Sequence, residues 1–212
     1  HTVAILIIPV ALILQSVEKN YDFKKHPFML EAYEERKWAF VSDIARLDII
    51  YSNGGIYLDT DVELVQNLDA LTQNCSAFFA SDGSGVNTGL GFGAVPNSEI
   101  VQTLLREYDG KSFKWSSGLD LTPCTDYNTR ALEKIGFKND DTNQKIGDVY
   151  VYDRSYLSPL YGLNQELVIS SQTVGIHHSG RSWHTGKDKV KSMLRLFMGQ
   201  KITTLIKKLM GR

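Results

Sequence analysis

The chain has 212 residues and a formal net charge of −1, which is enough for one sizeable α/β domain and argues against bulk binding of nucleic acid. Apolar residues make up 42% of the sequence and charged residues 22%, as in an ordinary soluble globular protein. The two cysteines, Cys75 and Cys124, are too few for a disulfide framework and lack Cys-x-x-Cys spacing. We therefore expect a reduced, cytoplasmic setting.

The first elements along the chain are an apolar run and a long helix. The run Val3–Leu14 is too short to cross a bilayer as a helix and lacks the features of a signal peptide. We expect it to form one or two buried strands. The spacing of apolar residues in Phe28–Tyr51 then predicts mostly helix. Asn53–Gly55 should end this helix, because glycine readily adopts the left-handed conformation at a helix C-terminus.

Short strands and helices alternate through the following residues, which predicts an α/β fold. The glycine-rich stretch Asp82–Gly93 predicts a loop, and Ser98 is a candidate N-cap for the helix that comes after it. The predicted strands are Ile56–Leu58, Cys75–Ala80, Asp148–Tyr152 and Thr173–His177, and the predicted helices are Asn97–Tyr108 and Asp126–Ile135.

The C-terminal segment differs from the rest of the chain in its charge. Lys187–Arg212 holds eight Lys or Arg residues and a single acid, Asp188, among Leu, Ile, Phe and Met residues. It predicts a helical tail with a break near Gly199, separate from a main domain of residues 1–186. The tail fits either a solvated surface helix or an amphipathic helix on anionic lipid. We favour the second interpretation, a peripheral contact with the inner face of the membrane.

Two carboxylates follow the predicted strand in Gly54–Leu64, GGIYLDTDVEL. Asp59 and Asp61 are one residue apart, and buried carboxylates are costly unless they are paired. In open α/β sheets, ligands bind just beyond the carboxyl ends of strands. Two carboxylates at that place can share a hard divalent cation and leave coordination positions open to a phosphate. The stretch therefore indicates a metal site.

A longer stretch around this pair carries a family resemblance. The run FVSDIARLDIIYSNGGIYLDTDVEL, Phe40–Leu64, resembles the sugar-binding DXD signature of glycosyltransferase family 32. Relatives of that family include the catalytic domains of large clostridial glucosylating toxins. The resemblance extends from about Asn20 through Leu71, and it returns at GVNTGLGFGAVPN and IHHSGRSW. It implies a GT-A-like fold, with a mixed sheet flanked by helices.

The resemblance assigns roles to the polar residues around the carboxylate pair. It implies that Asp43 and Arg46 hold hydroxyls of the donor sugar, whereas their spacing alone also fits an intrahelical salt bridge. Asp59 and Asp61 would bind Mn²⁺ or Mg²⁺ together with the donor diphosphate. His177 would be a third metal ligand, and an imidazole would shift the preference towards Mn²⁺.

Four further residues are candidates for binding the donor. Tyr57 would line the sugar pocket or serve as a half-buried strand aromatic, and Asn87 would bind sugar hydroxyls or serve as a turn residue. The family likeness implies that Ser182 and Trp183 close over the diphosphate, since a hydroxyl and an indole N–H both donate to phosphate oxygens. The family's opening Ile-Pro-Lys-x-Ile-His segment is altered here, as Ile8-Pro9 is followed by VALIL. The choice between uridine and guanosine therefore stays open.

The resemblance implies a metal-dependent, retaining hexosyltransferase that uses a nucleotide-diphospho sugar. UDP-hexose is the favoured donor and GDP-mannose the alternative. The acceptor would be a saccharide or a lipid-linked saccharide in bacterial surface or capsular polysaccharide synthesis. Two other functions stay open. A haloacid-dehalogenase-type phosphatase also places Asp-x-Asp after a strand, although Glu63 departs from its pattern. A non-catalytic protein that binds sugar nucleotides is the third candidate.

Overall fold

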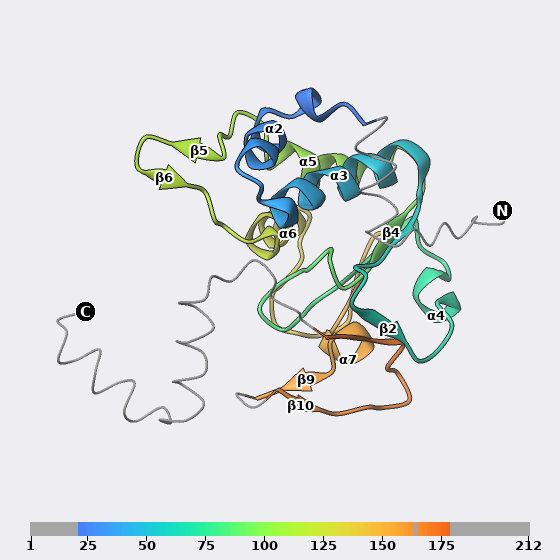
Figure 1. The fold of residues 1–212 in the computed structure, drawn as a ribbon. Helices are drawn as coiled ribbons and strands as arrows, with labels where there is room; N and C mark the ends of the chain where they lie inside the picture. The colour runs from blue at the N-terminus through green and yellow to red at the C-terminus, as the bar shows by residue number, and fades with distance from the viewer. Residues whose placement is uncertain (1–20, 163–164, 179–212) are drawn as a thin grey trace, which may run out of the picture.

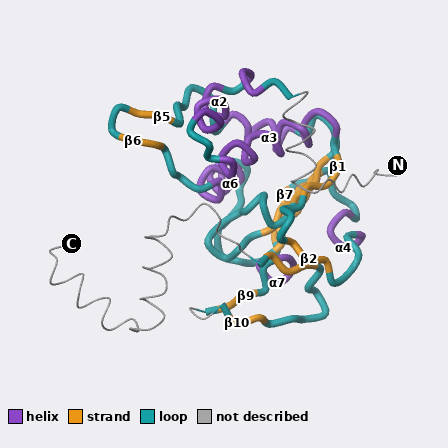
Figure 2. The backbone as a smooth tube through the Cα atoms, viewed as in Figure 1, coloured by secondary structure: helices purple, strands orange, loops and turns teal. Residues whose placement is uncertain are grey.

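The computed structural model describes residues 21–162 and 165–178, and Figures 1 and 2 show the arrangement of their helices and strands. The apolar run Val3–Leu14, the candidates Ser182 and Trp183, and the basic tail lie outside the described residues. The helices are η1 (Phe23–Lys25), α2 (Pro27–Glu34), α3 (Trp38–Asn53), α4 (Asp69–Thr72), α5 (Glu99–Arg106), α6 (Cys124–Glu133) and α7 (Arg154–Leu157). The strands are β1 (Gly55–Tyr57), β2 (Val62–Leu64), β3 (Ala77–Ala80), β4 (Phe92–Ala94), β5 (Lys114–Trp115), β6 (Gly118–Leu119), β7 (Gln144–Ile146), β8 (Val149–Tyr152), β9 (Leu160–Tyr161), β10 (Glu166–Leu167) and β11 (Gly175–His177).

A five-stranded mixed sheet forms the centre, in the order β1-β4-β3-β8-β7. Strands β3 and β8 are parallel, and the other neighbours in this sheet are antiparallel. A separate pair, β2 and β11, runs antiparallel and places His177 opposite Val62. This small pairing brings a residue near the end of the described chain next to the segment that follows β1.

The central strands are buried on both faces, and each face packs on a different layer. Alternate side chains of a strand point to opposite faces, so Ala77 and Phe79 belong to one core while Phe78 and Ala80 belong to the other. Helices α2, α3, α5 and α6 supply the first core, which is the larger one, and they cluster on one side of the sheet in Figure 2. Helices α4 and α7 contribute to the second core. The predicted α/β fold, a mixed sheet flanked by helices, is confirmed.

The helix predicted over Phe28–Tyr51 is two helices. The chain breaks between α2 and α3, where Arg36 has a φ of +56°, in the left-handed region that non-glycine residues rarely adopt. Neither glycine nor proline marks this break, so the sequence offers no turn signal there. Helix α2 packs against both α3 and η1.

The stretch Asp82–Gly93, predicted as a loop, contains the start of strand β4. Glycines occur there because the strand passes close to its neighbours. A Cβ at Gly93 would lie 2.6 Å from the Phe78 ring, and one at Gly91 would lie 2.7 Å from Leu58. Glycines next to one another in sequence are typical of a turn, whereas here close packing requires Gly93 within the strand and Gly91 just before it.

The C-terminal end of helix α3 and the N-terminal end of helix α5 lie where the sequence predicts them. Helix α3 ends at Asn53, and Gly54 follows with a φ of +67°. A Cβ at Gly54 would lie 2.6 Å from Pro96, which is a second reason for glycine at this position. Helix α5 has Ser98 at its N-cap position, but the serine side chain makes no capping hydrogen bond.

Within the described ranges, no helix is both long and apolar enough to cross a bilayer.

Candidate functional site

Helix α3 presents a buried ion pair towards the end of strand β1. Asp43 and Arg46 are three residues apart on one helical face and are 9% and 4% exposed, respectively. Arg46 Nη2 donates to Asp43 Oδ1. Two charges at this depth are costly unless they are paired and hydrogen-bonded, so the pair depends on good geometry.

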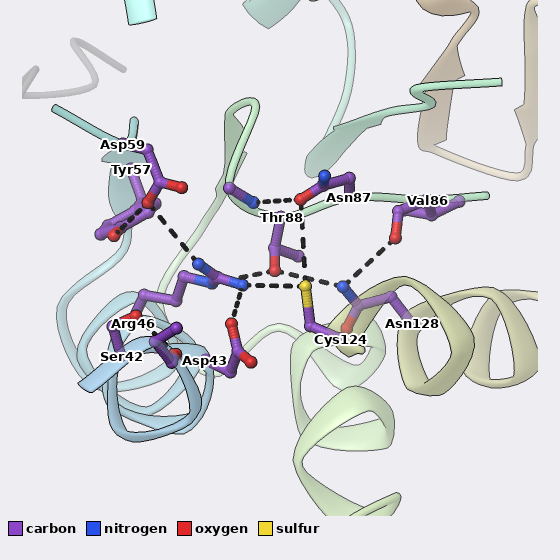
Figure 3. Close-up of polar contacts among 12 residues, drawn as sticks. Ser42, Asp43, Arg46, Tyr57, Asp59, Val86, Asn87, Thr88, Cys124 and Asn128 are labelled. Carbon is purple, nitrogen blue, oxygen red and sulfur yellow. Dashed lines mark hydrogen bonds and ion pairs between the residues drawn. The ribbon is translucent and has the colours of Figure 1, made fainter. Parts of the chain in front are cut away.

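The Arg46 guanidinium is held by several elements besides its own helix (Figure 3). Its Nε donates to Thr88 Oγ1 at 2.9 Å, and its Nη2 also donates to Cys124 Sγ at 3.1 Å. Its Nη1 lies 3.6 Å from Asp59 Oδ1, and the guanidinium is 5.5 Å from the centre of the Tyr57 ring. Burial opposes the charge of Arg46, but Asp43 keeps the pKa of Arg46 well above its usual range. The residue therefore stays cationic and connects α3 to the carboxylate after β1.

Burial also shifts the titration of Asp43. Loss of hydration raises the pKa of Asp43 to about 6, although the Arg46 charge opposes the shift. Because the folded-state pKa exceeds the ordinary 3.8, the stability that Asp43 contributes is complete at low pH. It is lost as the pH rises through about 6.

We expect this loss to be visible when wild type is compared with Asp43→Asn. Between pH 4 and pH 7, wild type should lose on the order of 2 kcal/mol of unfolding free energy relative to the variant, since one pKa unit corresponds to about 1.4 kcal/mol. Urea unfolding at several pH values in metal-free buffer measures the difference. A difference that stays constant across this range would show that Asp43 ionises as it does in water.

Asp59 lies two residues after the end of β1 and is contacted by residues from several segments of the chain. Tyr57, on β1, donates its hydroxyl hydrogen to Asp59 Oδ1 at 2.7 Å, and the Asp59 N–H donates to the Gly89 carbonyl at 3.1 Å. Burial favours the protonated carboxyl, but His177 and Arg46 outweigh it and hold the pKa of Asp59 below its usual range. Asp59 is therefore a carboxylate at neutral pH.

Three side chains converge beyond this strand. Asp59, Asp61 and His177 each offer one ligand atom, and these atoms all lie within 4.8 Å of one another. His177 Nε2 is 3.2 Å from Asp61 Oδ1 and 3.8 Å from Asp59 Oδ2. Two carboxylate oxygens and an imidazole nitrogen suit a first-row divalent cation such as Mn²⁺, and three ligands leave positions for phosphate oxygens. The residues therefore fit the metal that the sequence predicts.

The pairing of β2 with β11 decides which of the two adjacent histidines faces the carboxylates. His177 points towards Asp59 and Asp61, whereas His178 Nε2 lies 2.9 Å from Glu63 Oε2 on the exposed side. The His178 N–H also donates to the Asp61 carbonyl at 3.0 Å, which fixes the register of the two segments. Neighbouring residues on a strand point to opposite faces, so only one of the two histidines can join the carboxylate pair.

The loop before β4 brings Asn87 and Gly89 to the same place. Asn87 Oδ1 accepts from the Gly89 N–H at 2.8 Å, and Asn87 Nδ2 donates to Asp82 Oδ2 at 3.1 Å. A Cβ at Gly89 would lie 2.5 Å from Asp59 Oδ2, so only glycine leaves that carboxylate in its position. Asn87 is thus anchored beside the carboxylates, and its role towards a sugar stays a prediction.

Sequence reasoning missed three residues of this site, namely Thr88, Cys124 and Asn128. Cys124 begins helix α6 and contacts Arg46, and burial raises the pKa of its thiol. Thr88 and Asn128 are 0% and 1% exposed. Thr88 lies in the stretch GVNTGLGFGAVPN, but nothing there singles out its hydroxyl, and Cys124 and Asn128 lie in no recognisable motif. The packing of α6 against the loop before β4 brings Asn128 to Thr88 (Figure 3).

Comparison with known protein families supports a glycosyltransferase. The family described as "Glycosyltransferase sugar-binding region containing DXD motif" matches residues 9–77, a range that includes α3, β1, Asp59 and Asp61. A search of curated proteins returned no match. The mixed α/β architecture is consistent with a GT-A-like glycosyltransferase fold. Domains with this motif usually bind a divalent metal, and the Asp59–Asp61–His177 cluster is the candidate site for one here.

Proposed function

We propose that this protein is a metal-dependent, retaining hexosyltransferase that takes its sugar from a nucleotide-diphospho donor. One observation carries the proposal. The buried Asp43–Arg46 pair lies against Asp59, which in turn belongs to the Asp59–Asp61–His177 cluster. The ion pair that would bind sugar hydroxyls thus lies beside the candidate metal cluster, with Arg46 Nη1 3.6 Å from Asp59 Oδ1, which suits a ligand that joins a sugar to a diphosphate.

Different residues would bind the sugar and the diphosphate of the donor. Asp59, Asp61 and His177 would hold Mn²⁺, or Mg²⁺, which when bound stabilises the charge that develops on the departing diphosphate. The Asp43 carboxylate can accept hydrogen bonds from sugar hydroxyls, and Arg46 can donate to them. Tyr57 orients Asp59 through its hydroxyl and lies beneath the Arg46 guanidinium. Asn87 would contact the sugar, and Ser182 and Trp183 would contact the diphosphate.

Retention of the anomeric configuration is proposed from the family resemblance. The carboxylates nearest to Arg46 are already engaged, Asp43 by Nη2 and Asp59 by Nη1 and Tyr57. We assign no carboxylate the role of covalent nucleophile, because Asp43 and Asp59 are given other roles, towards the sugar hydroxyls and the metal. We therefore propose displacement on one face of the sugar, through a transition state resembling an oxocarbenium ion, with the acceptor hydroxyl entering beside the departing diphosphate.

The biological setting is proposed from the sequence. The donor would be a UDP-hexose, with GDP-mannose as the alternative, and the acceptor a saccharide or lipid-linked saccharide. We propose a role in bacterial surface or capsular polysaccharide synthesis, in the cytoplasm at the inner face of the membrane. The segment 187–212 would form the membrane contact, separate from the catalytic domain of residues 1–186.

Release of free nucleotide from a panel of UDP- and GDP-sugars tests the proposal. We expect one donor to be turned over with Mn²⁺, more slowly with Mg²⁺, and not at all after treatment with EDTA. Re-addition of Mn²⁺ should restore the rate, which separates loss of metal from loss of fold. Saccharide acceptors should be included, because some transferases release nucleotide only when an acceptor is bound.

Three outcomes would contradict the proposal. Absence of metal-dependent nucleotide binding, measured calorimetrically with UDP and GDP, would exclude a donor site of this kind. Trapping of Asp59 by beryllofluoride would instead favour a phosphatase with an aspartyl-phosphate intermediate. Binding of the nucleotide sugar without turnover, across all acceptors, would indicate a non-catalytic binding protein.

A further inference from the structure

Helix α6 and the loop before β4 hold the Arg46 guanidinium through a buried threonine. The Thr88 hydroxyl oxygen accepts from Arg46 Nε at 2.9 Å and from Asn128 Nδ2 at 3.1 Å. Asn128 Nδ2 is also 3.3 Å from the Val86 carbonyl, to which it donates. Three chain segments distant in sequence therefore meet at one hydroxyl, as Figure 3 shows.

The hydrogen bonds of Arg46 determine which edge of the guanidinium is left for a ligand. A guanidinium carries five N–H donors in a rigid plane. Nε is directed at Thr88, and Nη2 is directed at both Asp43 and Cys124. Nη1 points towards Asp59, at the longer distance of 3.6 Å. The edge that remains for a ligand is therefore the one that carries Nη1, on the side of Asp59.

The buried Asn128 side chain makes hydrogen bonds through its nitrogen only. It is 1% exposed, and its Oδ1 has no hydrogen-bond partner among the described residues, whereas its Nδ2 has two. A buried acceptor without a partner lowers stability. The side chain is thus oriented so that Nδ2 donates to both Thr88 and Val86.

We propose that Thr88 and Asn128 are positioning residues, which turn the Arg46 guanidinium so that only its Nη1 edge faces the donor sugar beside Asp59. This inference rests on the proposed function, since the donor sugar is the ligand that the edge would serve. The Thr88 oxygen uses its two lone pairs to accept from Arg46 and Asn128. Without it, Nε loses its acceptor and the guanidinium plane can rotate about the side-chain bonds.

The test compares Thr88→Val with Thr88→Ser. Valine keeps the shape of threonine and removes the acceptor, whereas serine keeps the acceptor. We expect Thr88→Val to lower kcat/KM for the donor by about 10- to 100-fold, as a displacement of about 1 Å does in other active sites. Thr88→Ser should stay within about threefold of wild type, and the affinity for Mn²⁺ should be unchanged in both variants.

A double-mutant cycle with Arg46→Lys shows whether Thr88 acts through Arg46. Lysine has no Nε–H to donate to Thr88, so Thr88→Val should have little further effect in the Arg46→Lys background. Equal effects of Thr88→Val in both backgrounds would overturn the proposal. So would wild-type kcat/KM in a folded Thr88→Val variant.

A spectroscopic measurement keeps the test independent of turnover. In ¹⁵N-labelled wild type, the Arg46 Nε–H should give a protected resonance, assigned by its loss in Arg46→Lys. Thr88→Val and Asn128→Leu should broaden or shift this resonance, and Thr88→Ser should preserve it. An unchanged resonance in Thr88→Val would overturn the positioning role. If the protein turned over no donor, the proposed function would fail. The Arg46 Nε–H resonance would still show whether Thr88 fixes the position of the guanidinium.

Discussion

Asp61→Ala should abolish metal-dependent turnover of the donor, with a loss on the order of 10³-fold in kcat, comparable to loss of a major electrostatic contribution to catalysis. Asp61 offers one of the three ligand atoms of the candidate metal cluster, and its Oδ1 is 3.2 Å from His177 Nε2. Removal of this carboxylate leaves one oxygen and one nitrogen ligand from the cluster. Initial rates at saturating donor measure the loss in kcat, and calorimetric titration with Mn²⁺ measures the loss in metal affinity.

Asp61 is a cleaner test of the metal site than Asp59. Asp59 also accepts from Tyr57 and lies beside Arg46, so its replacement would disturb the buried network as well as the metal. A matched control is Asp109→Ala, which removes an exposed carboxylate elsewhere in the fold. The control should keep wild-type rates and metal affinity. If Asp61→Ala kept a metal-dependent rate within tenfold of wild type, the cluster would not be the catalytic metal site.

Arg46→Met should destabilise the folded protein by about 3–5 kcal/mol, the usual cost of leaving a buried charge without its partner. Arg46 is 4% exposed, and it is the cation that faces both Asp43 and Asp59. Methionine preserves much of the side-chain volume, so the loss reports charge and hydrogen bonds rather than a cavity. Urea unfolding of the metal-free protein at pH 8 measures the difference.

The destabilisation should depend on pH in a defined direction. The Arg46 charge lowers the pKa of Asp43, so its removal should raise that pKa above its present value of about 6. A carboxyl whose pKa is raised in the folded state makes the protein less stable as the pH rises towards that pKa. In the variant this loss of unfolding free energy continues to a higher pH. The difference between Arg46→Met and wild type should therefore be larger at pH 8 than at pH 5.

Two further variants identify the cause of this loss. Arg46→Lys keeps the charge but not the planar fork, and it should destabilise the protein less than Arg46→Met does. The double variant Asp43→Asn/Arg46→Met removes both charges and should recover part of the lost stability. An Arg46→Met variant within about 1 kcal/mol of wild type at pH 8 would contradict the view that this ion pair supports the fold.

The elements with a strong local signal were predicted well from the sequence. Helix α5 lies within the predicted Asn97–Tyr108, and strands β3 and β8 lie within their predicted ranges. The apolar pattern of these segments matches a buried face, and packing reinforces it. The break between α2 and α3 was missed, because it depends on a left-handed Arg36 with no glycine or proline nearby. Strand β4 was missed, because Gly93 within it and Gly91 before it serve close packing.

The residues of the candidate site differ in how visible they are in the sequence. Asp59 and Asp61 follow an apolar strand, and this local pattern indicates a metal site. Asp43 and Arg46 share a helical face, but their spacing also fits an intrahelical salt bridge, and the family resemblance selected them. His177 was selected by its resemblance to a family pattern, and the structure brings it to the two carboxylates. The roles of these residues towards metal and sugar stay predictions. The predictions for Ser182, Trp183 and the basic tail concern residues outside the described part of the chain.

By itself, the sequence determined the α/β class, the helix that carries Asp43 and Arg46, and the carboxylate pair at the end of a short strand. These features depend on apolar periodicity and on spacing within a few residues, which the chain encodes locally. Only the tertiary structure decided that His177 rather than His178 faces the pair, and that Thr88 and Asn128 hold Arg46. Those contacts join α3, α6, β11 and the loop before β4. Their geometry depends on strand register and helix packing between segments far apart in sequence, which local pattern does not specify.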